Sequence, residues 1–182
     1  MSGQAPADAI PTVITERLIL RPHRVADFEA CAALWADPEV VRFIGGVPST
    51  REQSWGRLLR YSGSWHMLGF GFWAMEERLS GTFIGEAGFL EGRRAMTPSI
   101  EGTLETGWVL SPSAQGKGYA TEALAAMIGW GELHFPDRRM TCIIATEHLA
   151  SLRVAARLGF EAVMKTIYLN SEVMLLERPA RG

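Results

Sequence analysis

The chain has 182 residues, of which 47% are hydrophobic and 21% charged, and its formal net charge is −2. This composition excludes a disordered chain, and the length suits one domain with a single core. The small net charge provides no electrostatic footprint for nucleic acid or an anionic membrane, so we expect neither partner. No signal-peptide pattern or membrane-length apolar run is evident, which predicts a cytoplasmic protein.

The cysteines and histidines do not form a metal-binding pattern. Cys31 falls in a helical pattern and Cys142 in a strand pattern, which predicts two small core residues rather than a disulfide. The four histidines share no ligand spacing with each other or with cysteine, so we expect no structural metal.

The chain begins with residues 1–11, which are small, polar or proline-containing and predict a flexible leader. Residues 12–182 are expected to form the single domain. A short β-prone run over residues 15–22 ends in proline and predicts the first strand. Apolar residues at helical spacing over residues 26–35 predict a helix, which ends before Pro38.

A second helix is expected over residues 49–67, because the Ser49 hydroxyl stands three positions before Glu52, as in a capping box. Two runs rich in aromatic and apolar residues follow, at 70–76 and 82–90. A glycine-containing turn separates them, which is typical of an antiparallel hairpin.

The second half of the chain alternates strands and helices before a closing hairpin. The expected elements are a loop at 91–101, strands at 104–110 and 140–145, helices at 119–134 and 150–158, and a strand pair at 162–169 and 173–177. This order predicts an α+β (mixed α/β) domain, with a mostly antiparallel central sheet of about six to seven strands flanked by about four helices.

The connection between strand 104–110 and helix 119–134 contains a candidate anion-binding turn. Gly116 and Gly118 can adopt positive φ and admit a phosphate close to the backbone, and Lys117 between them adds a positive charge. The alternative is an ordinary glycine-containing turn with no ligand. The pattern favours a phosphorylated cofactor at this turn.

Four separated segments resemble the GNAT N-acetyltransferases, especially the branch of ribosomal-protein N-terminal acetyltransferases. They are Thr15–Pro22, Asp37–Val40, Gln115–Ala123 and Ala150–Phe160. The third fits the family signature Gln/Arg-x-x-Gly-x-Gly/Ala. The resemblance implies a GNAT-like domain in which two central parallel strands splay apart and hold acetyl-CoA in the gap.

By this resemblance the pantetheine arm of acetyl-CoA pairs with the backbone of strand 104–110, and the pyrophosphate meets the N–H groups of the glycine turn. The implied cofactor-binding residues are Trp108, Val109, Leu110, Gln115, Gly116, Lys117, Gly118, Tyr119, Ala120, Thr121, His148 and Ser151. The side chains of the three strand residues are also compatible with ordinary core packing.

The family's reaction is attack of a neutral amine on the thioester carbonyl, followed by departure of the CoA thiolate. Glu105 is the candidate base, acting through water, with Glu86 and Glu101 as rivals. Without the resemblance, Glu105 would be interpreted as a solvent-facing or salt-bridged strand residue. Ser151 is the candidate group beside the leaving thiolate.

Two departures from the family pattern concern the second cofactor-contacting helix. His148 stands where the family commonly has Asn, and is also compatible with a plain surface histidine. The helix lacks the tyrosine that the family often uses as general acid. This absence leaves open a different class of function, a non-catalytic acyl-CoA-binding sensor or regulatory module.

The acceptor site implied by the resemblance lies among the first helices, their connecting loop and the facing strands. Its candidate residues are Trp35, Phe43, Phe72 and Glu86, and for the aromatic residues the alternative is core packing. A protein N-terminus, a small polyamine or amino acid, and an amine-bearing antibiotic all remain possible acceptors. We expect a monomer or homodimer.

Overall fold

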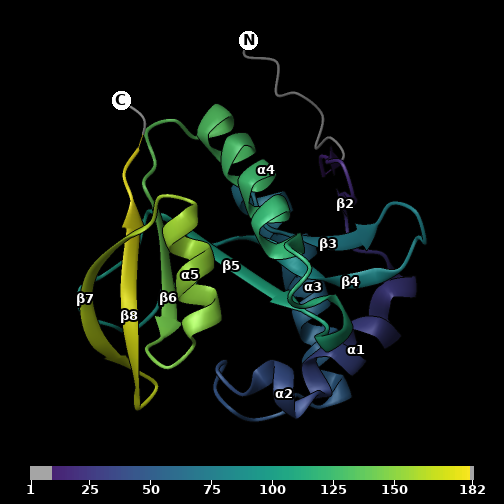
Figure 1. Ribbon diagram of the computed structural model, residues 1–182, viewed down its shortest axis with the longest axis horizontal. Coiled ribbons are helices and arrows are strands. Elements are labelled where there is room, and N and C mark those ends of the chain that lie inside the picture. The colour runs from purple at the N-terminus through teal and green to yellow at the C-terminus, as the bar shows by residue number, and fades with distance from the viewer. Residues whose placement is uncertain (1–9, 181–182) are drawn as a thin grey trace.

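The computed structural model describes residues 10–180, which form one eight-stranded sheet with helices on both faces (Figure 1). The strands are β1 Val13–Ile14, β2 Leu18–Arg21, β3 Phe72–Glu77, β4 Phe83–Leu90, β5 Leu104–Leu110, β6 Met140–Ala145, β7 Glu161–Tyr168 and β8 Ser171–Arg178. The α-helices of the described part are α1 Phe28–Ala36, α2 Pro38–Val41, α3 Arg51–Leu68, α4 Tyr119–His134 and α5 Leu149–Arg157.

The strand order is β1-β2-β3-β4-β5-β6-β8-β7, and every neighbouring pair is antiparallel except β5 and β6. The predicted mixed α/β fold with one parallel pair is therefore confirmed. The eighth strand is β1, which lies before the run 15–22 predicted as the first strand; the start of that run forms a turn, so β2 begins only at Leu18. The backbone N–H of Thr15 donates to the Leu18 carbonyl at 2.9 Å, which separates β1 from β2.

The start of α3 and the presence of a short extra helix, α2, differ from the prediction for local reasons. The helix α3 is capped by Thr50 and Gln53 rather than by Ser49 and Glu52, since Thr50 and Gln53 exchange side chain to backbone hydrogen bonds at 2.8 and 3.2 Å. The helix α1 ends before Pro38 as predicted. Asp37 then caps a further single turn, α2, which supplies the fifth helix.

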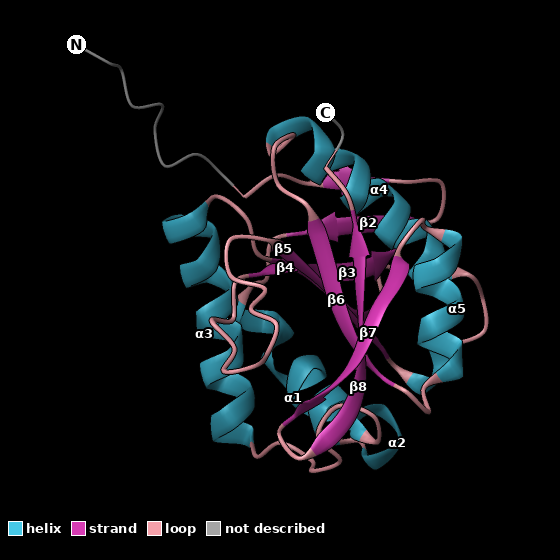
Figure 2. Cartoon of the chain, turned by 90° about the vertical axis from the view of Figure 1, so that its left-hand side faces the viewer, coloured by secondary structure: helices cyan, strands magenta, loops and turns pink. Residues whose placement is uncertain are grey.

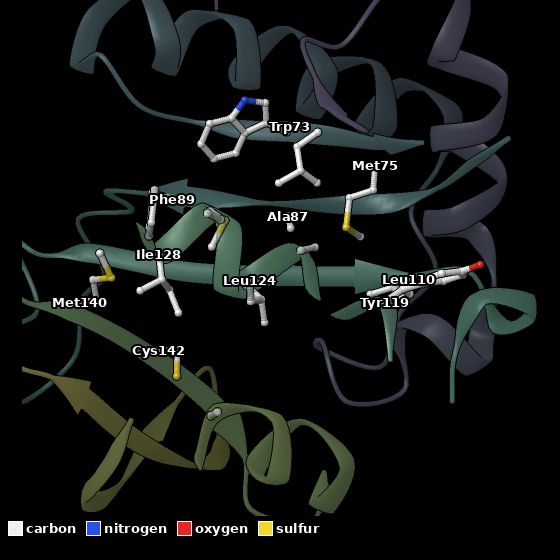
Figure 3. Close-up of a cluster of buried hydrophobic side chains, with 14 of the residues drawn as sticks. Trp73, Met75, Ala87, Phe89, Leu110, Tyr119, Leu124, Ile128, Met140 and Cys142 are labelled. Atoms are coloured by element: carbon white, nitrogen blue, oxygen red, sulfur yellow. The ribbon is translucent and has the colours of Figure 1, made fainter. Parts of the chain in front are cut away.

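Figure 2 shows α3 on one side of the sheet and α4 with α5 on the other. The α4 face carries the larger core, in which Trp73 and Phe89 of the central strands pack against Leu124 and Ile128 of α4 (Figure 3). Each fully buried side chain of this kind stabilises the fold by roughly 1.5–3 kcal/mol. This packing fixes the start of α4 relative to the end of β5.

Cys31 and Cys142 are buried free thiols, as the sequence predicts. Among residues 10–180, no helix combines the length and the apolar character needed to cross a membrane. Most of the predicted leader, residues 1–9, lies outside the described range. The carbonyl of Pro11 accepts a hydrogen bond from Trp73 Nε1 at 2.7 Å, so the end of that segment contacts the domain.

Candidate functional site

The parallel strands β5 and β6 pair only at one end. Leu104 lies opposite Met140 and Glu105 opposite Thr141, whereas β5 continues to Leu110 without further pairing to β6. On its other edge β5 stays paired with β4 from Glu105 to Leu110. The two strands thus diverge beyond Glu105, and one edge of the β5 backbone faces the gap. Such an edge can accept an extended ligand as an added strand.

The turn after β5 closes one side of this gap. Gly116 and Gly118 have φ values of +74° and +80°, so both occupy the left-handed region that disfavours other residues. Gly118 is the N-cap of α4, and the first three N–H groups of that helix have no hydrogen-bond acceptor among the described residues. The exposed Lys117 lies between the glycines. This arrangement of N–H groups and positive charge suits an anion.

In the strand predicted to bind pantetheine, the side chains pack into the protein, so the backbone is the part left to contact a ligand. Val109 lies in the small core cluster formed with α1 and α2, and Trp108 packs partly buried against the larger core. Leu110 is buried, and its carbonyl accepts a hydrogen bond from Gln115 Nε2 at 3.1 Å. Tyr119 is buried, with its hydroxyl donating to Glu77, while Ala120 and Thr121 are half-buried in the first turn of α4.

On the β6 side of the gap, His148 connects a predicted cofactor residue to a predicted acceptor residue. Its ring stacks on Phe43 with centroids 4.4 Å apart and an interplanar angle of 14°. Its Nε2 atom lies 3.3 Å from Oγ of the buried Ser151. Partial burial lowers the pKa of His148, which favours the neutral imidazole. The loop after α2 and the start of α5 are therefore in contact.

Glu105 stands where β5 and β6 begin to diverge. It is 4% exposed, and both of its carboxylate oxygens accept hydrogen bonds from Arg94 Nε, at 2.7 and 2.8 Å. Arg94 Nη1 also donates to the hydroxyl of Tyr168 at 2.8 Å. The carboxylate thus has the salt-bridged environment that was the alternative to a free base. Its rival Glu101 is exposed in the loop before β5.

The other rival, Glu86, is fully buried under the α1–α3 layer. It accepts hydrogen bonds from Trp35 Nε1 at 2.8 Å, Tyr61 Oη at 3.0 Å and His23 Nε2 at 3.2 Å. Burial opposes ionisation of Glu86, but the hydrogen bonds from His23 and Trp35 outweigh it and hold the pKa below its ordinary value. Glu86 is therefore a satisfied buried anion.

The predicted acceptor residues do not gather on one surface. Trp35 and Phe72 are buried, Trp35 against Glu86 and Phe72 stacked on Tyr61 with centroids 4.8 Å apart. Only Phe43, in the loop after α2, remains partly exposed, and it contacts His148. The buried positions follow from helix–sheet packing, which uses aromatic residues at the same spacing.

His23, Cys31 and Glu86 have ligand atoms within 4.8 Å of one another. The oxygens of Glu86 already accept hydrogen bonds from three neighbours, and burial together with the Glu86 charge raises the pKa of the Cys31 thiol. A metal would need a thiolate and a free carboxylate oxygen here. The cluster is therefore better described as a hydrogen-bonded network than as a metal centre.

Two groups at this site were not predicted as site residues from the sequence. Arg94 lies in the loop 91–101, and no sequence pattern pairs it with Glu105. Arg17 donates from Nε to Glu122 Oε2 at 2.6 Å and from Nη1 to the Lys117 carbonyl at 2.9 Å. The sequence held a signal for the contact between Arg17 and Glu122, because both residues lie in segments that carry the resemblance.

The model of the family described as "Acetyltransferase (GNAT) domain" matches residues 17–161. A putative GNAT-family acetyltransferase from Bordetella pertussis is 32% identical, with a TM-score of 0.82, and the match covers 92% of this chain and 99% of that one. An uncharacterized N-acetyltransferase, p20, from Bacillus licheniformis is 25% identical over 151 residues, which are 82% of each protein.

Two more distant structures share the fold. One is a ribosomal α-N-protein acetyltransferase in complex with coenzyme A, which is 16% identical, with a TM-score of 0.73 and coverage of 94% of this chain and 99% of that one. The other is a spermidine N-acetyltransferase from Vibrio cholerae in complex with CoA and spermine, which is 14% identical, with a TM-score of 0.71 and coverage of 91% and 97%. The family model spans the diverging strands and the glycine turn, and the chain belongs to the GNAT acetyltransferase family.

Proposed function

We propose that this protein transfers the acetyl group of acetyl-CoA to a primary amine, with both substrates bound at once. The observation that supports this most strongly is the divergence of β5 from β6 beside a glycine turn whose N–H groups are unpaired within the described chain. An acyl-CoA has the two features that such a site recognises, an extended amide-containing arm and a pyrophosphate.

The residues present fit this cosubstrate. The β5 backbone from Trp108 to Leu110 would pair with the pantetheine arm, and the turn from Gln115 to Thr121 would bind the pyrophosphate. When bound, acetyl-CoA supplies an electrophilic thioester carbonyl. His148 and Ser151 would border the arm from the β6 side, and the Ser151 hydroxyl, 3.3 Å from His148 Nε2, would donate a hydrogen bond to the departing thiolate.

In the proposed reaction the amine nitrogen forms a bond to the acetyl carbon, the carbon–sulfur bond breaks, and the thiolate takes the electron pair. A protonated amine must first release one proton to water to become a nucleophile, and the attacking neutral amine then loses a second proton, to water or to the thiolate. Of the three candidate carboxylates, Glu105 is engaged by Arg94 and Glu86 by three donors, while Glu101 is exposed in the loop before β5. An acceptor whose amine is already partly neutral reduces the need for help with the first of these proton losses. An α-amine, with a pKa near 7.7–8.0, meets that condition better than a lysine side chain near 10.4.

We therefore propose an α-amine, on a peptide N-terminus or a small molecule, as the acceptor class. Most of the rate would then come from holding the two reactants together. Glu105, predicted as the base, would serve mainly to hold Arg94 and the end of the gap in place.

An amine panel tests the proposed function. Purified protein is incubated with acetyl-CoA and, separately, with peptides bearing a free N-terminus, an N-blocked peptide with lysine, amino acid amides and spermidine, and products are identified by mass spectrometry. We expect acetylated product and an equimolar amount of CoA, formed faster with the α-amines than with the lysine side chain or spermidine. Acetyl-CoA binding without transfer to any amine would favour the non-catalytic sensor, and faster acetylation of spermidine would contradict the acceptor class.

A further inference from the structure

The segment Thr15–Arg17, between β1 and β2, binds the first turn of α4 by hydrogen bonds to both carboxylate oxygens of Glu122. Thr15 Oγ1 and the backbone N–H of Arg17 donate to Oε1 at 2.6 and 2.8 Å, and Arg17 Nε donates to Oε2 at 2.6 Å. We call this segment the Thr15–Arg17 clamp. It brings to α4 a part of the chain that lies more than a hundred positions earlier.

Arg17 also reaches the glycine turn itself. Its Nη1 donates to the Lys117 carbonyl at 2.9 Å, and its guanidinium carbon lies 4.7 Å from the centroid of the Tyr119 ring. Arg17 therefore contacts the residues on both sides of Gly118, as well as Glu122 one helical turn later. Arg17 belongs to the N-terminal segment and not to α4, so these contacts hold the glycine turn from a second part of the chain.

The clamp is anchored independently of α4. Arg78, after β3, donates from Nη1 to the carbonyls of Thr15 and Glu16 at 2.8 and 3.0 Å. The backbone N–H of Arg78 donates to the Arg17 carbonyl at 2.9 Å. Because these bonds tie the clamp to the sheet, it can hold the glycine turn in register with the strands.

The clamp also compensates a charge. A glutamate in the first turn of α4 interacts favourably with the helix dipole, but it would repel a phosphate bound at the same end. Burial raises the pKa of Glu122, yet hydrogen bonds from Thr15 and Arg17 outweigh burial and hold that pKa below its ordinary value. The ionised carboxylate thus faces Arg17 as its direct counter-charge.

We infer that the Thr15–Arg17 clamp positions the cofactor turn: Arg17 holds the backbone from Lys117 to Tyr119 in its anion-accepting conformation and neutralises Glu122 beside the bound phosphates. The inference rests on the proposed function, since it takes the ligand of the turn to be a phosphorylated acyl thioester. Arg17 is a positioning residue here.

The test is the dissociation constant of acetyl-CoA, measured by calorimetry on the full chain. Arg17→Met should weaken binding about 10-fold or more, because it frees the turn and leaves Glu122 uncompensated. The double variant Arg17→Met/Glu122→Gln should recover part of that loss. Arg17→Lys, which keeps the charge but not the second donor, should lie between Arg17→Met and the unaltered chain.

Arg139→Met is the matched control, because Arg139 forms a comparable ion pair with Glu177 at 2.9 Å and is 49% exposed, against 44% for Arg17. It lies at the paired end of β6, away from the turn, and should leave the dissociation constant within about twofold. Thermal unfolding of each variant separates a binding loss from a folding loss.

A phosphate-free thioester separates positioning of the turn from general damage. With an acceptor amine, Arg17→Met should lower kcat/KM for acetyl-CoA but not for S-acetylpantetheine. Unchanged acetyl-CoA affinity in Arg17→Met, or equal losses with both thioesters, would overturn the inference. If acetyl-CoA binds and depends on Arg17 but no amine is acetylated, the proposed function fails while the role of the clamp stands.

Discussion

At the scale of single residues, the pairing of Glu105 with Arg94 decides which role Glu105 can take. A carboxylate whose two oxygens accept hydrogen bonds from one guanidinium is well suited to holding that guanidinium in place. Arg94 in turn binds Tyr168 at the end of β7, so the pair joins the loop before β5 to the closing hairpin. We therefore propose that Glu105 mainly holds Arg94 in place, and through it the loop before β5.

Substituting Glu105 separates the two roles. With an α-amine acceptor, Glu105→Gln should lower kcat/KM less than 10-fold and leave the pH–rate profile unchanged, whereas loss of a general base typically costs 10²–10⁴-fold. Arg94→Met should be more damaging than Glu105→Gln, because it leaves a buried carboxylate without its counter-charge. A loss above about 100-fold in Glu105→Gln, with loss of the acidic limb, would restore Glu105 as the base.

At the scale of elements, the site depends on where β5 stops pairing with β6 and where α4 begins. Gly118 sets where α4 begins, because it is the N-cap of that helix and its φ of +80° directs the first N–H groups of α4 toward the end of the gap. A side chain there is strained in this conformation and would also approach Arg17 Nη2 at 3.4 Å.

Gly118→Val should therefore weaken acetyl-CoA binding about 10-fold or more, because a β-branched side chain both disfavours the positive φ and obstructs the backbone. Gly129→Ala is the matched control within the same helix. A Cβ at Gly129 meets no atom within 4 Å, so this change should leave binding intact and stabilise α4 by up to about 1 kcal/mol. Calorimetry and thermal unfolding measure both effects, and unchanged affinity in Gly118→Val would remove the turn from the site.

Most of the elements were predictable from sequence because their signals are local. Hydrophobic periodicity and terminal glycine or proline residues placed α4, α5 and the hairpins, and the glycine turn was identified from residue type alone. The partners of Glu86 and Glu122 were not predictable, because Trp35 and Thr15 lie 51 and 107 positions away and only the folded chain brings them close. Burial of Trp35 and Phe72 was left open for the same reason. Arg94 lies 11 positions before Glu105, but it stands in a loop where no sequence pattern pairs it with a strand residue.

At the scale of the whole molecule, buried carboxylates join the N-terminal segment to the sheet. Asp27 bonds to Arg21 through both oxygens at 2.8 Å, and Glu86 bonds to side chains from α1, α3 and the loop before α1. Burial opposes ionisation of Asp27, but hydrogen bonds from Arg21 and Arg24 outweigh it and lower its pKa. The folded state thus favours both carboxylates in the ionised form.

The free energy of unfolding should therefore decrease as the solution is acidified. Because the folded pKa values of Asp27 and Glu86 lie below the unfolded ones, the unfolded chain binds more protons, and the free energy of unfolding should fall as pH drops below about 5. Urea unfolding between pH 7 and pH 4 measures this slope. Glu86→Gln should flatten it, whereas Glu52→Gln, at an exposed position, should not; equal slopes in all three proteins would contradict the assignment.

We propose that acetyl-CoA lies in the gap between β5 and β6, against the glycine turn. Backbone hydrogen exchange, followed by mass spectrometry with and without acetyl-CoA, tests it most directly. We predict slower exchange at residues 106–110 and 116–121 when acetyl-CoA is present, with little change in β7. Unchanged exchange in those two segments under saturating acetyl-CoA, or protection confined to another part of the sheet, would contradict this placement of acetyl-CoA.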